Sequence, residues 1–234
     1  MNLFGEETRL LVVAPHADDE TLGAGGAIAH TVAAGGTARV LVATASDMFY
    51  EHAGRMVTVE ERRGELSDAC AALAGAGEVR SEILFPGFEA RLDRLERSAL
   101  VTALDHALAR WTPTAVLFPY PSHHQDHRTL YQACLAALRP RGTPGPAFVG
   151  MYEYPFVHSH GDFSAPGHGL AYLQLTEEDG ERKLTALSRH ESQMEGRSES
   201  SLISASSVLL WMEMRGREIG VQWAEVYRVW RMHG

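Results

Sequence analysis

Apolar and polar positions divide the chain into short apolar runs and longer amphipathic stretches. An uninterrupted apolar run predicts a strand covered on both faces, because a strand with one wet face would alternate. Apolar residues at helical spacing predict helices between the strands. The strands are expected at residues 9–14, 38–44, 82–85, 115–120, 147–154 and 223–230, and the helices at 27–34, 58–73, 92–111, 128–138 and 176–190.

Strands and helices alternate over most of the chain, and this order predicts the fold class. Alternation is typical of an α/β protein with a mainly parallel, Rossmann-like sheet, in which right-handed crossovers place helices on both faces. A chain of 234 residues fits one such unit, so a single domain over residues 1–234 is expected.

Two polar clusters directly follow apolar runs. Residues 16–20 hold one histidine and three carboxylates after the first strand, and residues 122–127 hold three histidines and an aspartate after the run 115–118. In a parallel sheet, ligands bind beyond the carboxyl ends of the strands, so both clusters are expected to face one crevice. Imidazole and carboxylate donors that converge predict a metal ion, with a spare carboxylate free to act as a base.

The glycines that follow the first cluster suggest a competing prediction. Gly23, Gly25 and Gly26 resemble a dinucleotide-binding loop, but Ile28 occupies the position of the third glycine of that motif. Three acids just upstream would also repel a pyrophosphate. A tight strand-to-helix turn is therefore the expected role of these glycines.

The composition of the chain limits the kinds of molecule that it is expected to bind. The net charge of −9 argues against a nucleic-acid partner, and a small substrate fits better. A signal peptide and a membrane span are both absent from the pattern, so a cytoplasmic protein is expected. Cys70 and Cys134 lie in helical stretches and are expected to be buried thiols. Met212 and Met214 beside Trp211 fit either the core or a subunit contact, which leaves a homo-oligomer open.

The two clusters together resemble the PIG-L/LmbE-like family of zinc-dependent N-deacetylases. The first family motif is matched by residues 15–20, with Ala17 where proline is usual, and the HxDH motif by residues 124–127. Weaker matches extend the resemblance over residues 9–230. They are Arg62 with Glu65, Lys183 with Ser192 and Gln193, and Glu225 with Val226 and Tyr227.

The resemblance implies a metal site and a base. His16, Asp19 and His127 would hold one zinc ion, and Asp18 would be the general base that activates water. The implied reaction is release of acetate from the amide nitrogen of an N-acetylated amino sugar, such as a small glycoside of N-acetylglucosamine.

The same resemblance implies roles around the reacting carbonyl. His124, oriented by Asp126, would stabilise the oxyanion. Some relatives carry a tyrosine at the position of Ser122, and Tyr120 is a substitute for it nearby.

Other polar residues carry weaker expectations. Arg62, Lys183 and Glu225 are expected to bind substrate, although Arg62 could equally form a helix pair with Glu65. His123 is expected to be an ordinary loop residue. The loop at residues 155–169 is expected to form a pocket wall, with a second metal site as the weaker alternative for its three histidines, His158, His160 and His168.

Two other functions stay open at this point. Asp18 and Asp19 could bind magnesium in a phosphoesterase, although histidines nearby favour a transition metal over magnesium. A Rossmann-like module that binds a sugar or nucleotide without catalysis is the third hypothesis.

Overall fold

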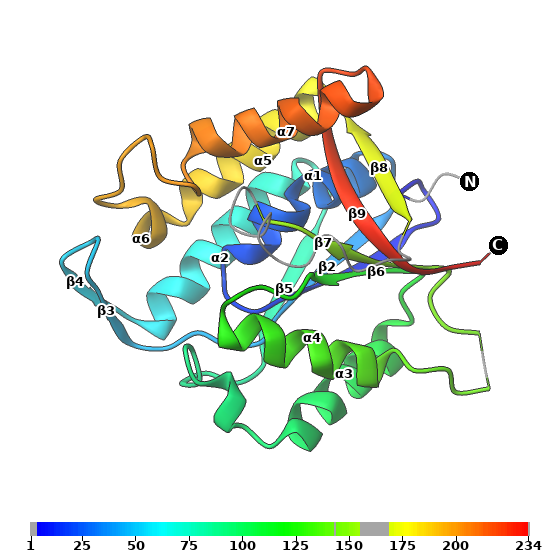
Figure 1. Cartoon of the computed structure of the whole chain (residues 1–234), viewed down its shortest axis with the longest axis horizontal. Helices are drawn as coiled ribbons and strands as arrows, with labels where there is room; N and C mark the ends of the chain where they lie inside the picture. The colour runs from blue at the N-terminus through cyan, green and yellow to red at the C-terminus, as the bar shows by residue number, and fades with distance from the viewer. Residues whose placement is uncertain (1–3, 143, 155–168, 234) are drawn as a thin grey trace.

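One mixed sheet organises the chain in the computed structural model, which describes residues 4–142, 144–154 and 169–233 (Figure 1). The seven strands lie in the order β5-β2-β1-β6-β7-β9-β8. From β5 to β7 neighbouring strands are parallel, whereas β9 runs antiparallel to both β7 and β8. In chain order the strands are β1 (Arg9–Ala14), β2 (Thr37–Val42), β5 (Val79–Ile83), β6 (Ala115–Pro119), β7 (Phe148–Tyr152), β8 (Leu170–Leu175) and β9 (Trp223–Met232).

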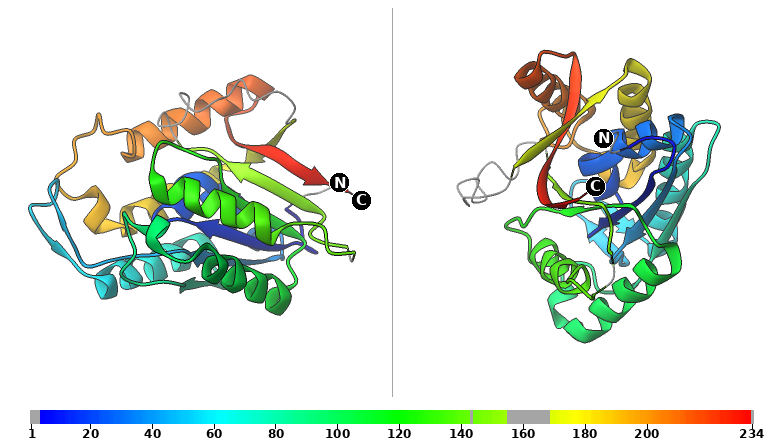
Figure 2. Two further views of the ribbon diagram at one scale, coloured as in Figure 1. Left: turned by 60° about the horizontal axis from the view of Figure 1, so that its bottom comes forward. Right: turned by 90° about the vertical axis from the view of Figure 1, so that its right-hand side faces the viewer.

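Helices cover both faces of the sheet. One face carries α1 (Asp19–Ala33), α2 (Val59–Ala74), α5 (Glu177–Arg189) and α7 (Ala205–Ile219), and the other carries α3 (Arg97–Trp111) and α4 (Gln125–Ala137), as the two views of Figure 2 show. Leu10 and Val12 of β1 pack into the first layer, while Leu11 and Val13 pack into the second. Because the central strands contribute side chains to two apolar cores, their sequences are continuous apolar runs. The predicted fold class is confirmed.

The strand order reverses at β1, which lies between β2 and β6. Chain connections therefore leave the carboxyl ends of β1 and β6 in opposite directions, and a crevice forms between two such ends. His16 follows β1, and Ser122 follows β6. The fold thus brings the two polar clusters to the same edge of the sheet.

Several elements differ from the sequence prediction. Strand β5 begins at Val79, earlier than expected, because its exposed polar residues hide an edge strand from an apolar-run criterion. The expected loop after β2 contains the short hairpin β3 (Met48–Tyr50) and β4 (Arg55–Val57). Two short helical turns, η1 (Leu92–Arg94) and α6 (Glu191–Met194), complete the order of elements.

Threonine side chains cap the N-termini of α2 and α5. Thr58 accepts a hydrogen bond from the Glu61 amide at 3.1 Å, but the Glu61 carboxylate pairs with Arg55 rather than completing a capping box. Thr176 and Asp179 form a full capping box in front of α5.

Cys70 and Cys134 are buried free thiols, as predicted. No helix among the described residues is both long enough and apolar enough to span a membrane.

The glycine cluster lies inside helix α1, so the prediction of a strand-to-helix turn is wrong. These glycines allow close packing instead. A Cβ at Gly23 would overlap the ring of Tyr152, and one at Gly26 would lie 2.7 Å from the methyl groups of Leu175. Helix α1 therefore approaches the sheet more closely than any side chain at these positions would permit.

This close approach predicts the effect of adding one methyl group. Gly23→Ala should lower the free energy of unfolding by about 1–3 kcal/mol, because the Tyr152 ring has to move. Gly64→Ala in α2 is the matched control, since open space surrounds that position, and it should raise stability by up to about 1 kcal/mol. Urea unfolding measures both variants. A Gly23→Ala protein as stable as the parent would contradict the packing role.

Candidate active site

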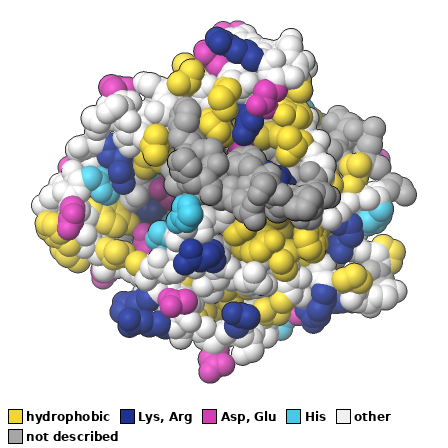
Figure 3. All heavy atoms as spheres, viewed as in Figure 1, with side chains coloured by type: hydrophobic (Ala, Val, Ile, Leu, Met, Phe, Trp, Pro, Cys, Tyr) yellow, Lys and Arg dark blue, Asp and Glu magenta, His cyan; other side chains and the backbone are white. Residues whose placement is uncertain are grey.

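Three imidazoles meet beyond the carboxyl ends of β1 and β6. The ring centroids of His16, His124 and His127 lie 5.0 to 5.4 Å apart. In Figure 3, histidine side chains gather beside acidic side chains left of the centre of the face shown. His16 and His127 lie 111 positions apart in the sequence, yet their donor atoms share one site with Asp19.

His16, Asp19 and His127 form a group that fits a metal ion. One donor atom from each lies within 4.8 Å of the other two, and all three residues are buried. Asp19 Oδ2 lies 3.2 Å from His16 Nδ1 and 3.5 Å from His127 Nε2. Two imidazole nitrogens and a carboxylate are the donor set of an open transition-metal site.

Asp126 holds His16 in place. Its buried carboxylate lies 2.9 Å from His16 Nε2 and also accepts hydrogen bonds from the amides of Ala90 at 2.7 Å and Leu92 at 2.9 Å. His16, His124 and Asp126 also form a group with metal-binding spacing. Because the Asp126 oxygens are already taken by three N–H donors, this carboxylate is better suited to orient a ligand than to be one.

Asp126 contacts His124 through its backbone amide rather than through its carboxylate, and its part in orienting His124 stays a prediction. His124 is the N-cap of α4, and its Nδ1 accepts a hydrogen bond from the backbone amide of Asp126 at 3.2 Å. An accepting Nδ1 places the ring proton on Nε2. Burial and the nearby His16 lower the pKa of His124. The ring is thus a neutral donor through Nε2.

Ser122 fixes His127 from behind. Its Oγ lies 3.0 Å from His127 Nδ1 and accepts a hydrogen bond from the amide of His124 at 3.1 Å. If His127 Nε2 is to bind a metal, Nδ1 carries the proton and donates it to Ser122. Ser122 therefore has a positioning role here. Tyr120, the nearby tyrosine named from the sequence as a substitute, packs against Arg228, whose Cζ lies 4.7 Å from the centroid of the tyrosine ring.

Electrostatics differ between the two neighbouring aspartates. Burial raises the pKa of Asp19, but His127 and His16 more than offset this and hold it well below its usual range. Burial and the charge of Asp19 raise the pKa of Asp18 to about 6, against the opposing effect of Arg62, whose Nη2 lies 3.6 Å away. Burial lowers the pKa of His16, but its bonds to Asp126 and Asp19 raise the net value to about 10. The site therefore attracts a cation.

A family model described as PIG-L, GlcNAc-PI de-N-acetylase, matches residues 11–138, which is more than half of the chain. The chain belongs to the PIG-L family. Both polar clusters lie inside the matched region. Family membership confirms the resemblance predicted from the motifs and the predicted enzyme class, an amide-hydrolysing deacetylase. No curated protein sequence matches the chain significantly.

Solved structures share the fold over nearly the whole chain. The A40926 pseudoaglycone deacetylase Dbv21 is 23% identical with a TM-score of 0.72, covering 97% of this chain and 99% of its own. The N,N'-diacetylchitobiose deacetylase from Pyrococcus horikoshii is 19% identical with a TM-score of 0.70, covering 98% and 86%. The 4-carboxy-2-hydroxymuconate hydratase GalB from Pseudomonas putida KT2440 is 18% identical with a TM-score of 0.66, covering 97% and 98%. A hydratase among them shows that this fold alone does not fix the reaction.

Two residues expected to bind substrate instead support helix α1 of this PIG-L chain. Lys183 Nζ donates to the carbonyl of Leu22 at 2.9 Å and to Glu225 at 2.6 Å. Glu225 accepts from the amides of Gly26 and Ala27, both at 2.8 Å. Both side chains are buried. The prediction that Lys183 and Glu225 bind substrate is replaced by a structural role.

Arg62 lies under the site rather than on its surface. Its side chain is 1% exposed and reaches Asp18, at 3.6 Å, and Glu65, at 3.8 Å. The helix pair of Arg62 with Glu65 is therefore present, and Arg62 reaches Asp18 as well. Glu65 in turn accepts hydrogen bonds from the amide and the hydroxyl of Ser192. The match around Ser192 thus has a structural basis, and substrate binding by Arg62 stays a prediction.

The last acid of the first motif is also committed to the core. Glu20 is fully buried, with Oε1 2.9 Å from His190 Nε2 and 2.8 Å from the Thr21 hydroxyl. His190 lies next to α6, so this contact joins the start of α1 to the segment after α5. Three consecutive carboxylates therefore have three different sets of partners.

Sequence reasoning missed a group from the ends of β2 and β5. Glu89 accepts hydrogen bonds from the amide of Ser46 at 3.0 Å and the hydroxyl of Tyr50 at 3.1 Å. Ala90 has a φ of 62°, and Gln125 and Asp126 both bind its peptide groups. The sequence signal that could have revealed this group is a polar residue, Ser46, shortly after the end of β2.

Two remaining expectations concern histidines outside this cluster. His123 is exposed, and its carbonyl accepts from Arg128 at 2.9 Å, which agrees with an ordinary loop residue. His158, His160 and His168 lie outside the described residues.

The three hydrogen bonds to Asp126 predict a loss of metal affinity on substitution. Asp126→Asn should weaken metal binding about 10–100-fold, because an amide cannot accept from His16 and two backbone amides together. Competition with a chromophoric chelator measures the affinity. Asp93→Asn, an exposed acid one residue beyond Leu92, is the control and should bind as the parent does. An unchanged affinity in Asp126→Asn would remove this positioning role.

The contacts of Lys183 predict a loss of stability without a change in substrate affinity. Lys183→Met should lower the free energy of unfolding by about 3–5 kcal/mol, because Glu225 is left buried without its partner. The double variant Lys183→Met/Glu225→Gln should lose less than the sum of the single losses. Thermal unfolding measures stability, and KM of the folded protein should not change. A raised KM with normal stability would restore the substrate role.

Proposed function

We propose that this protein is a zinc-dependent hydrolase that removes the acetyl group from the amide nitrogen of an N-acetylated amino sugar in the cytoplasm. The observation that supports it most directly is the group of His16, Asp19 and His127 beside a spare buried carboxylate, Asp18. Family membership and the names of the two similar deacetylases favour an acetylated sugar over other amides.

The donor set favours zinc. His16, Asp19 and His127 would hold the ion, since two imidazoles and one carboxylate leave coordination positions open for hydrolysis. When bound, zinc polarises a carbonyl group and makes water more acidic. Magnesium prefers oxygen ligands and keeps several waters, so the imidazoles disfavour the phosphoesterase alternative.

The protein residues would move the proton and stabilise charge. Asp18 would take a proton from the attacking water and deliver it to the leaving amine, as a general base and then acid. Arg62 lies 3.6 Å from Asp18 and keeps the carboxylate oriented. His124 would donate through Nε2 to the carbonyl oxygen as negative charge develops there, which is the role of an oxyanion-hole donor.

Loss of the base should abolish turnover without loss of the metal. Asp18→Asn should reduce amine release from N-acetylglucosamine glycosides about 10²–10⁴-fold, while bound zinc stays near the parent amount. A fluorogenic amine reagent measures turnover, and elemental analysis measures zinc. Asp68→Asn, an exposed acid on α2, is the control. Asp18→Asn protein that still deacetylates at the parent rate would overturn the assignment of the base.

The same assay tests the reaction class. Parent protein should release amine from at least one sugar in a panel of N-acetylated monosaccharides, glycosides and chitobiose, and a chelator should stop it reversibly. A phosphate ester and an unsaturated dicarboxylate in the panel represent phosphoester hydrolysis and hydration. Turnover of the phosphate ester or the dicarboxylate, with no turnover of the amides, would refute the deacetylase proposal. A zinc-loaded protein that turns over no compound of the panel would refute it too.

A further inference from the structure

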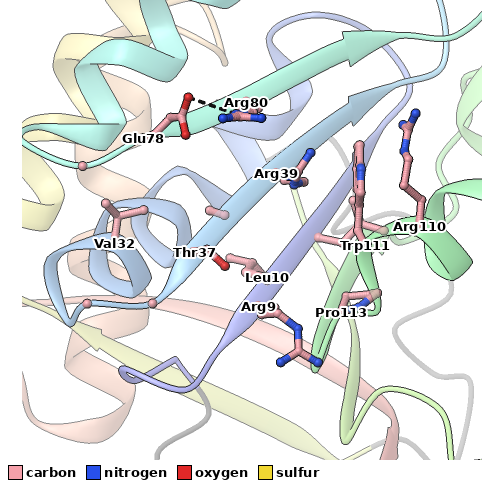
Figure 4. A pocket seen from close by; sticks show the side chains of 15 residues that line it. Arg9, Leu10, Val32, Thr37, Arg39, Glu78, Arg80, Arg110, Trp111 and Pro113 are labelled. Carbon is pink, nitrogen blue, oxygen red and sulfur yellow. Dashed lines mark hydrogen bonds and ion pairs between the residues drawn. The ribbon is translucent and has the colours of Figure 1, made fainter.

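A cavity of about 460 Å³ lies at the opposite end of the sheet from the metal-binding group. Arg9 begins β1 and lines this cavity, whereas His16 follows the last residue of the same strand. Arg39 of β2, Arg80 of β5 and Arg110 of α3 also line it, around the ring of Trp111 (Figure 4). None of these residues belongs to the site described above.

Arg39 and Arg80 are direct neighbours across two parallel strands. They occupy the same register position in the pairing of β2 with β5, so both side chains leave the same face of the sheet. Like charges at directly paired positions destabilise a sheet. An anion bound between them would remove this repulsion.

Trp111 holds two of the guanidinium groups. The guanidinium carbons of Arg39 and Arg110 lie 4.8 and 4.9 Å from the indole ring, and Figure 4 shows them on either side of it. Such cation–π contacts restrict long side chains that would otherwise move freely. Both faces of the ring are used, so the ring itself offers no face for stacking an aromatic ligand.

The charges around the cavity do not cancel. Arg80 pairs with Glu78 at 2.9 Å, and Arg110 pairs with Glu82 at 2.7 Å. Arg39 forms no ion pair within the described part of the chain. Four arginines thus face two carboxylates in a protein whose net charge is −9. An alternative role for the charges on the edge strand β5 is to prevent association with the sheet edge of another molecule. That role does not explain Arg39, which lies on the inner strand β2.

We propose that this cavity binds the phosphate group of a small phosphate-bearing metabolite. The planar guanidinium groups of Arg39 and Arg80 match the geometry of phosphate oxygens, which they can bind in a bidentate manner. The volume is sufficient for a small metabolite. Because the cavity and the metal-binding group lie at opposite ends of β1, this ligand does not compete with the substrate for the same atoms.

Pyrophosphate is the probe for this site, measured by isothermal titration calorimetry on the full chain. Parent protein should bind one equivalent saturably. Arg39→Gln should weaken binding at least about tenfold, because it removes a charge-assisted hydrogen-bond donor. Arg80→Gln changes an exposed residue, and it should weaken binding similarly without disturbing the fold. Arg217→Gln on α7, also exposed, is the control and should bind as the parent does.

A second measurement separates this cavity from the metal centre. His127→Ala should keep the affinity for pyrophosphate, and pyrophosphate should raise the Tm of the parent and of Arg217→Gln by more than that of Arg39→Gln. Lack of binding at millimolar pyrophosphate would overturn the proposal. So would equal affinity in Arg39→Gln and the parent, which would leave the arginines as surface charges only. Loss of binding in His127→Ala would assign the anion to the metal centre instead.

Discussion

The buried carboxylate of Asp126 is the contact on which the site depends. Its oxygens accept hydrogen bonds from His16 after β1 and from Ala90 and Leu92 beyond β5, while the residue itself lies in the first turn of α4 after β6. Burying a carboxylate without hydrogen-bond partners would raise the free energy of the folded state. The hydrogen bonds to Asp126 therefore keep these three donors together. One side chain thus fixes the relative positions of three strand ends.

Buried polar contacts continue outward from this point. Asp18 touches Arg62, Arg62 touches Glu65, and Glu65 accepts from Ser192. On the other side of α1, Lys183 and Glu225 bind its backbone where glycines bring the helix against the sheet. The polar residues of this PIG-L chain therefore form a buried support around His16, Asp19 and His127.

The apolar pattern was enough to predict the parallel core, because strands buried on both faces are apolar throughout. It failed for β5, whose residues are largely exposed at the edge, and for the glycines, which lie in a helix. The meeting of His16, Asp19 and His127 at metal-binding spacing was predictable from motif and position, since both clusters directly follow strands. Glu89 and Ser46 were missed because a single polar residue after a strand resembles any loop.

The sequence by itself determined the alternation of strands and helices, the two clusters and the family, because these depend on local order and spacing. Only the tertiary structure decided which partner each polar residue has. The carboxylate of Asp126 bonds to His16, whereas its backbone amide bonds to His124, and Lys183 pairs with Glu225 beside helix α1. Strand register placed Arg39 beside Arg80, and tertiary packing placed Arg39 against Trp111. Such pairings join residues far apart in the chain, and spacing in the sequence carries no information about them.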